Sequence, residues 1–155
     1  MTFLRKLSPL RRIAAIRPIS LCAALALAAC DAGYEVCTTH YPSGEVWSVR
    51  YYATGQPHRP WIAWYPDSTP RLQSHYANGA RTGLWRTVAP NGAILFERSY
   101  REDEPHGEWR RFHPNGQLAS SQAFERGRPV GTWAFYDEGG TLLREEQHGA
   151  AAATD

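Results

Sequence analysis

The chain has 155 residues, of which 43% are hydrophobic and 12% aromatic, so it can form a folded core and is unlike a disordered chain. Its net charge of +2 hides an uneven distribution: residues 1–29 hold five basic residues and no acid, whereas the remainder holds 12 arginines and 15 acids, a net charge of −3. A mildly acidic body argues against a general nucleic-acid binder, which needs a basic stripe to displace counterions from phosphates.

The first 29 residues have the order of an export signal. Basic residues precede an apolar run at 19–29, and eleven residues are too few to span a bilayer as a helix. The run ends in Leu27-Ala28-Ala29-Cys30, which resembles the lipobox of bacterial lipoproteins. The resemblance implies cleavage before Cys30, lipid on its thiol and acylation of the new amino terminus, which together hold a protein firmly on a membrane. An ordinary secreted protein cleaved near Ala29 is the alternative.

A lipidated Cys30 places the rest of the chain in the bacterial cell envelope, outside the cytoplasm, with inner and outer membrane both open. Cys22 leaves with the signal peptide, so Cys37 has no intramolecular cysteine partner and we expect no disulfide framework and no cysteine-based metal site. A small buried hydrophobe is the favoured role for Cys37, and a reactive thiol is the alternative. Residues 30–36 form a short tether in this interpretation, and residues 150–155 form a flexible tail.

A repeat of 24 residues begins at Cys37. Most units have a proline five positions after the anchor, a glycine seven positions after it and an aromatic residue fifteen positions after it. The first and last units are degraded, as is typical of a stacked array whose end faces meet solvent. The five units cover residues 37–149, and four of them have a tryptophan as anchor: Trp61, Trp85, Trp109 and Trp133.

Each unit predicts two short strands and two turns. In the unit that starts at Trp109, WRRFH forms the first strand and Pro114-Asn115-Gly116 a tight turn, since proline presets φ and Asn and Gly tolerate positive φ. QLASSQAF forms the second strand by its period of two, and the linker ERGRPVG turns the chain back. No helical period follows Cys30. The sequence therefore predicts an all-β domain, an elongated antiparallel meander of about five hairpins.

This pattern resembles the bacterial MORN-like repeats, whose proteins are often labelled "YwqK-type antitoxin". The central units match best, with Asn-Gly after the first strand and an aliphatic residue two positions after that glycine. The departures are Cys37 for Trp, Ser68 for Gly and His148 for an aromatic residue. The resemblance implies a sheet of hairpin repeats and an interaction role, and it does not imply an enzyme.

Motifs that carry chemistry are absent from the sequence: it has no phosphate-binding loop, dinucleotide fingerprint, HExxH or GxSxG. We therefore predict no catalytic residue and no cofactor. The six histidines mostly differ in repeat phase, so we predict no metal site either. Glu145 and Glu146 point to opposite faces of an extended strand and do not form an acid/base pair. The acidic run at 101–105 suits a cation or a basic partner, although a solvated loop is the favoured interpretation.

The sequence favours a non-enzymatic, membrane-anchored repeat scaffold that binds a protein partner, in the manner of an antitoxin or immunity factor. A glycan or peptidoglycan-binding envelope module, with rows of Trp and Tyr stacking on sugars, is the second interpretation, and an envelope enzyme is the least favoured. The anchor tryptophans are the expected core, so the predicted interaction face lies on the other side of the strands, where simple packing is the alternative. This face comprises Arg86, Arg110, Trp64, Phe112 and Tyr136.

Overall fold

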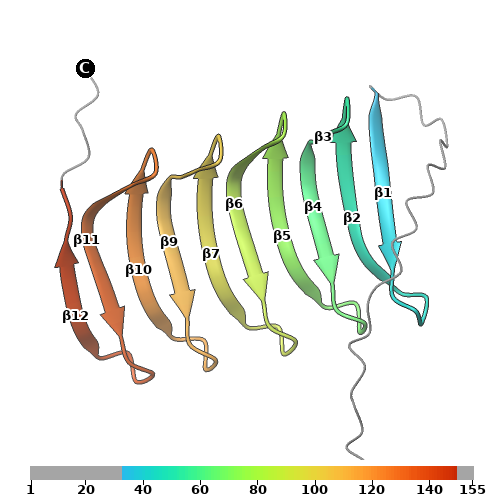
Figure 1. The fold of residues 1–155 in the computed structure, drawn as a ribbon. Coiled ribbons are helices and arrows are strands. Elements are labelled where there is room, and N and C mark those ends of the chain that lie inside the picture. Colours follow the sequence, from blue (N-terminus) through green and yellow to red (C-terminus); the bar gives the residue numbers. More distant parts are fainter. Residues whose placement is uncertain (1–32, 150–155) are drawn as a thin grey trace, which may run out of the picture.

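The computed structural model describes residues 33–149, which form one antiparallel sheet joined by turns. The predicted signal peptide, Cys30 and the tail at 150–155 lie outside the described residues. Neighbouring strands follow chain order from β1 at one edge to β12 at the other (Figure 1), so the predicted all-β meander of hairpins is confirmed. No helix among the described residues is long and apolar enough to cross a bilayer.

Each predicted unit supplies two neighbouring long strands, and the two-residue strands β3 and β8 pair with the ends of β2 and β7. The bounds are β1 (Tyr34–His40), β2 (Val46–Ala53), β3 (Gln56–Pro57), β4 (Arg59–Trp64), β5 (Pro70–Ala77), β6 (Ala80–Val88), β7 (Ile94–Arg101), β8 (Glu104–Pro105), β9 (Gly107–Phe112), β10 (Leu118–Glu125), β11 (Arg128–Tyr136) and β12 (Leu142–Gln147).

The turns within units all lie at the same end of the strands, the lower end in Figure 1. In the loop between β9 and β10, the His113 N–H donates to the Gln117 carbonyl at 2.8 Å, and the Gly116 N–H donates to the His113 carbonyl at 2.9 Å. The Asn115 side-chain oxygen accepts the Gln117 N–H at 3.0 Å, which closes the loop. The backbone pair recurs in every unit, so the turn predicted at Pro-Asn-Gly keeps its hydrogen bonds in units with other residues there.

The turns between units lie at the opposite end of the strands, and they contain fewer residues than the sequence predicted. ERGRPVG is mostly strand rather than linker, because Glu125 pairs with Arg128 and only Arg126 and Gly127 form the turn. Both turn residues have positive φ, 47° and 76°, as a two-residue type I′ hairpin requires. Two residues suffice because the twist of this turn matches the twist of the strands that it joins.

The strands also begin earlier than the sequence predicted. β11 begins five residues before Trp133, because the type I′ turn returns the chain directly into the ladder of strand hydrogen bonds. β1 begins at Tyr34, upstream of Cys37. Tyr34 pairs with Ala53, and its ring stacks on His58 with a centroid separation of 5.3 Å. Part of the predicted tether therefore belongs to the sheet.

A bulge follows each turn within a unit. In β10, Leu118 pairs with Phe112 and Ser120 pairs with Arg111, so Ala119 is the extra residue. A bulge of this kind bends the strand and increases its twist. The same register shift occurs in every unit, and the extra residues are Trp47, Arg71, Leu95, Ala119 and Leu143.

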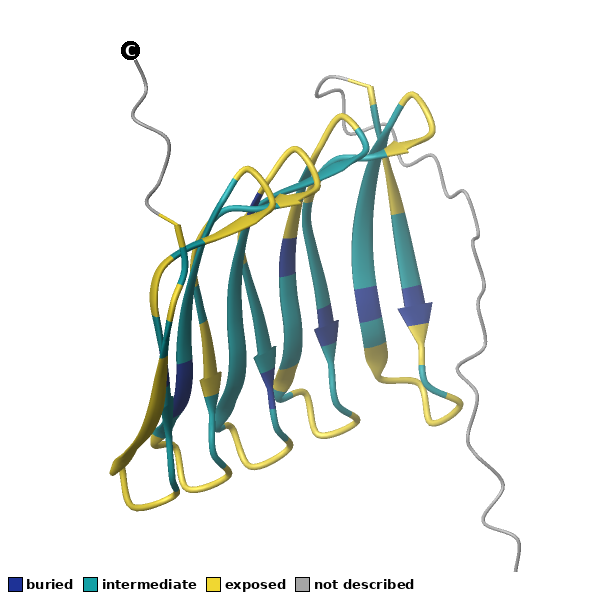
Figure 2. Ribbon diagram, turned by 60° about the vertical axis from the view of Figure 1, so that its left-hand side comes forward, coloured by how far each residue is buried: buried dark blue, intermediate teal, exposed yellow. Residues whose placement is uncertain are grey.

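The described residues form a single layer, and few of them are fully buried (Figure 2). Ser74 and Thr39 are the most deeply buried side chains, at 0% and 1% exposure, and Thr39 shares a hydrogen bond of 2.7 Å with Ser48. Most strand residues are half-buried, and most turn residues are exposed. Strand pairing and contacts between neighbouring units, rather than a closed core, hold this part of the chain together.

Candidate binding surface

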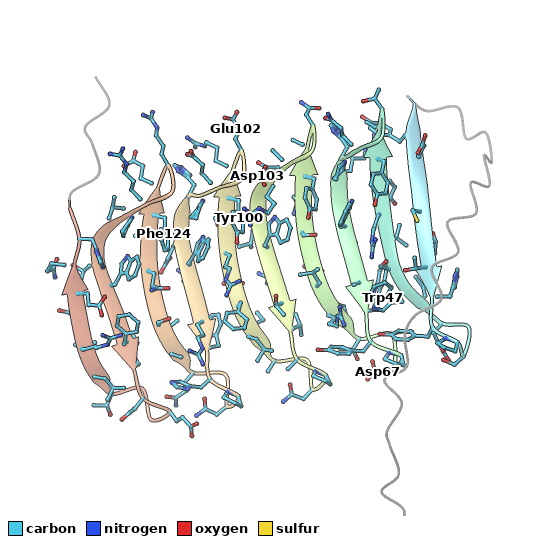
Figure 3. The ribbon with its side chains drawn as sticks, in the orientation of Figure 1. Trp47, Asp67, Tyr100, Glu102, Asp103 and Phe124 are labelled. Carbon is cyan, nitrogen blue, oxygen red and sulfur yellow. The ribbon has the colours of Figure 1, made fainter. Side chains whose placement is uncertain are left out.

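One face of the sheet carries a continuous ladder of rings, which we call the ladder face. Neighbouring ring centroids are 4.2 to 5.5 Å apart, and their planes are inclined by 45° to 66°, the tilted geometry that aromatic pairs prefer. Figure 3 labels Tyr100 and Phe124 within this row. The ladder runs through Tyr52, Trp61, Tyr76, Trp85, Tyr100, Trp109, Phe124, Trp133 and His148.

The four anchor tryptophans join each unit to the one before it. The Trp109 indole N–H donates to the Ser99 carbonyl at 2.8 Å, ten residues earlier, and the other three anchors make the same bond at 3.0 to 3.2 Å. The rings are only half-buried. The expectation that they form the core is therefore wrong in one respect, since no second layer covers them within residues 33–149.

The ladder continues at the carboxyl-terminal edge despite the degraded last unit. His148 occupies the aromatic position there, and its ring lies 4.2 Å from that of Trp133. At the other end, Cys37 occupies the anchor position in β1, is half-buried and pairs with Arg50. The ladder therefore begins at Tyr52 on β2 and ends at His148, directly after β12.

Arginines lie over the rings of the ladder face. The Arg50 guanidinium carbon is 5.4 Å from the centroid of Trp47 and 5.2 Å from that of Trp61. The Arg98 guanidinium carbon is 4.6 Å from the centroid of Phe96 and 5.3 Å from that of Trp109. These are cation–π distances. Neither arginine forms an ion pair with an acid of the described segment.

A shallow depression of about 300 Å³ opens on the ladder face between β7 and β11. Arg111 borders it, lies two residues beyond Trp109, and forms no ion pair with any described acid. The depression therefore combines aromatic walls with guanidinium and amide donors. It is lined by Phe96, Arg98, Trp109, Arg110, Arg111, Ser120, Gln122 and Phe135.

The opposite face carries paired charges, and we call it the ion-pair face. The Arg86 guanidinium contacts the Glu97 carboxylate at 2.6 Å, and that of Arg110 contacts Glu108 at 2.5 Å and Glu97 at 4.0 Å. The hydrogen bond from Arg110 lowers the pKa of Glu108 below its ordinary value, and the Ser121 hydroxyl donates to the same carboxylate at 2.8 Å. The charges of Arg86 and Arg110 are therefore neutralised by Glu97 and Glu108.

Residues 105–125 match the family model of the MORN repeat variant. The chain contains a MORN-like repeat. The matched segment covers β9, its loop and β10, which is one hairpin of the series that repeats along the sheet. No curated protein matches the sequence.

The MORN-like sheet brings Arg86 and Arg110 together around Glu97, as their shared repeat phase predicted. Trp64, Phe112 and Tyr136 lie at the loop end of their strands and are half-buried. Alternation along the strand places them on the same face as these arginines. The backbone carbonyls of Trp64 and Tyr136 also join units, because they accept hydrogen bonds of 2.9 Å from Tyr41 and His113. Whether this face binds a partner stays a prediction.

Sequence reasoning missed the acids of the ion-pair face. Glu97, Glu108 and Glu125 are the acids of the long strands from β2 to β11. Each is next in sequence to a residue of the ladder face (Arg98, Trp109 and Phe124), so strand alternation places all three on the ion-pair face. The sequence signal that could have located them is strand alternation, which places these acids on the face opposite the aromatic ladder.

The acidic run at 101–105 contains a turn that is bound to the preceding unit. Glu102 and Asp103 form the two-residue turn after β7, at the edge opposite Asp67 (Figure 3). The Asp103 carboxylate accepts the Arg81 backbone N–H at 3.0 Å and its guanidinium at 2.9 Å, and these bonds lower the pKa of Asp103. No three metal-ligating side chains come together within residues 33–149. The run joins two units of the sheet.

Proposed function

We propose that this protein is a lipid-anchored, non-enzymatic scaffold that holds a protein partner at the cell envelope. The observation that carries the proposal is the one-layer MORN-like sheet, whose units present the same side-chain rows on two open faces of the described segment. Repeat arrays bind partners through such rows because each unit adds one more contact of the same kind.

The position of the anchor suits this role. Cys30 precedes β1 by only four residues, and an extended chain of that length reaches about 14 Å. β12 is nine strand spacings away from β1, or about 43 Å at the usual spacing of strands. A lipidated Cys30 therefore holds the β1 edge near the membrane and leaves most of both faces accessible.

A protein partner is favoured over a glycan by the state of the ladder rings. Sugars stack on open ring faces, but Trp109 already has Tyr100 at 5.3 Å, Phe124 at 4.7 Å and the Arg98 guanidinium at 5.3 Å. The anchor rings therefore offer little free face to a sugar. An antitoxin or immunity factor is one form of this scaffold, and a toxin encoded beside it is its natural partner.

The anchor is tested by replacing Cys30 with alanine. We expect fatty-acid labelling of the wild-type chain, loss of the label in Cys30→Ala, and release of the variant from the membrane fraction. Cys37→Ala is the matched control and should remain labelled. Labelling that persists in Cys30→Ala would contradict the lipoprotein proposal. Recovery of a protein after crosslinking in cells supports the scaffold, whereas recovery of cell-wall polymer alone contradicts it.

A further inference from the structure

Arg98 has a stacked guanidinium with no acid beside it among the described residues. Its guanidinium lies against two rings, Phe96 and Trp109, and the side chain is half-buried. A guanidinium held by its planar faces keeps its N–H edge available, and that edge matches the two oxygens of a carboxylate. No acid of the described segment occupies it.

Arg50 repeats this arrangement two units earlier. It has the same repeat phase as Arg98, and its guanidinium also lies against two rings, Trp47 and Trp61. Four strand spacings separate β2 from β7, which places the two arginines about 19 Å apart. The residue of this phase between them is Ser74, which is small and fully buried, so no bulky side chain of that phase stands between the two guanidinium groups.

Between β2 and β11, the ladder face carries unpaired arginines and no acid of the long strands. Arg111 adds a third unpaired guanidinium, and the acids of the long strands in this region lie on the other face. At β12 the same repeat phase is occupied by Glu146, which pairs with Arg144 at 2.5 Å and ends the basic stretch. A ligand complementary to this region carries negative charge and spans at least the distance from Arg50 to Arg98.

We propose that the ladder face is a docking surface for an extended, acidic polypeptide segment whose carboxylates bind Arg50 and Arg98. This inference rests on the proposed scaffold function and names the chemistry of its partner. An extended chain advances by about 3.3 Å per residue, so two carboxylates about six residues apart reach both arginines. Arg111 and Gln122 border the depression beside Arg98 and supply further donors to the same segment.

The probe is a fluorescein-labelled decapeptide of glutamate, and the measurement is fluorescence anisotropy with the full chain in detergent. We expect saturable binding that weakens with added salt, because the contacts are between charges. A glutamine decapeptide of the same length should not bind. Arg50→Gln with Arg98→Gln should weaken binding about tenfold or more, since central arginines dominate such interfaces. Arg86→Gln with Arg101→Gln, a pair on the ion-pair face that removes the same charge and does not line the depression, should change it less than about twofold.

Circular dichroism checks that each variant is folded, and Arg50→Lys with Arg98→Lys provides a milder pair that keeps the charge. The lysine pair should bind more weakly than wild type and more tightly than the glutamine pair, because it lacks the planar fork. The inference would be overturned if the glutamine pairs on the two faces lost equal peptide affinity. It would also be overturned if the glutamate peptide did not bind the wild-type protein. If a protein partner is still captured in cells in that case, the scaffold stands and only the acidic ligand is wrong. Binding of cell-wall glycan in place of the peptide also overturns it.

Discussion

The two faces of this sheet use the same residue type for different purposes. On the ion-pair face, Arg86 and Arg110 lie 2.6 and 2.5 Å from carboxylate oxygens. On the ladder face, Arg50 and Arg98 lie 4.6 to 5.4 Å from ring centroids and have no acid beside them among the described residues. The pair of Arg86 and Glu97 joins two neighbouring strands, and that of Arg110 and Glu108 lies within β9, so both guanidinium groups are occupied. The stacked and unpaired arginines remain available to a partner.

The difference arises from the period of two along each strand. Glu97 and Arg98 are neighbours in sequence, yet they belong to opposite faces and to different networks. An arginine placed one position further along a strand therefore stacks on the rings of the ladder face and no longer joins the ion pairs of the other face. Charge segregation between faces depends on register, and a shift of one residue would reverse it.

The largest effect is expected on the ladder itself. Trp109→Ala removes contacts with Tyr100 and Phe124 and the hydrogen bond to Ser99. We expect a loss of about 2–4 kcal/mol in the free energy of unfolding, below the full range for a buried ring because Trp109 is half-exposed. Chemical denaturation measures it. Trp47→Ala, off the anchor phase, is the control and should cost less; equal losses would mean that the repeat register is wrong.

A smaller effect is expected from the ion-pair face. Arg86→Glu places a second carboxylate beside Glu97 and should lower stability by about 1 kcal/mol, since Glu97 is mostly shielded from water. Adding Glu97→Arg restores an opposite-charge pair and should recover part of that loss, because the new arginine also lies near Arg110. Thermal unfolding of the single and double variants shows the coupling. Purely additive losses would indicate that the pair contributes nothing.

The smallest effect concerns pH. The hydrogen bond from Arg110 lowers the folded-state pKa of Glu108 below its ordinary value of 4.5. The pair therefore stabilises the folded sheet fully at pH values above 4.5. That stabilisation is lost as the pH falls below 4.5 and through the folded-state pKa. Denaturation at stepped pH should show a slightly shallower acid loss, by a few tenths of a kcal/mol, in Glu108→Gln. Arg98→Gln should follow the wild-type profile, because no described acid pairs with Arg98.

Much of the fold was predictable because it depends on local sequence. The spacing of Trp85, Trp109 and Trp133 gives the repeat, and Asn115-Gly116 gives the turn. The two-residue turn at Arg126 was missed because an arginine with positive φ leaves no composition signal, unlike Asn-Gly. The bulge at Ala119 was missed for a similar reason, since only strand pairing reveals an extra residue.

The candidate surface was harder to predict, because its chemistry depends on pairing across strands. Repeat phase showed that Arg86 and Arg110 share a row, but the acid between them, Glu97, lies eleven residues after Arg86 and pairs only through the observed register. The sequence also assigned the Trp row to the core. A period of two reports which residues share a face, and it does not report whether a second layer covers that face.

The two faces of the sheet differ, and we propose that the ladder face binds the partner. Adjacent residues test it most directly, because Gln122 borders the depression on the ladder face and Ser121 contacts Glu108 on the ion-pair face. A photo-crosslinking benzoylphenylalanine is placed at each position in turn, and crosslinks to the glutamate decapeptide and to partners in cells are compared. We expect crosslinks from position 122 and few from position 121. Crosslinks from 121 alone would contradict the claim and favour the face of Arg86 and Arg110.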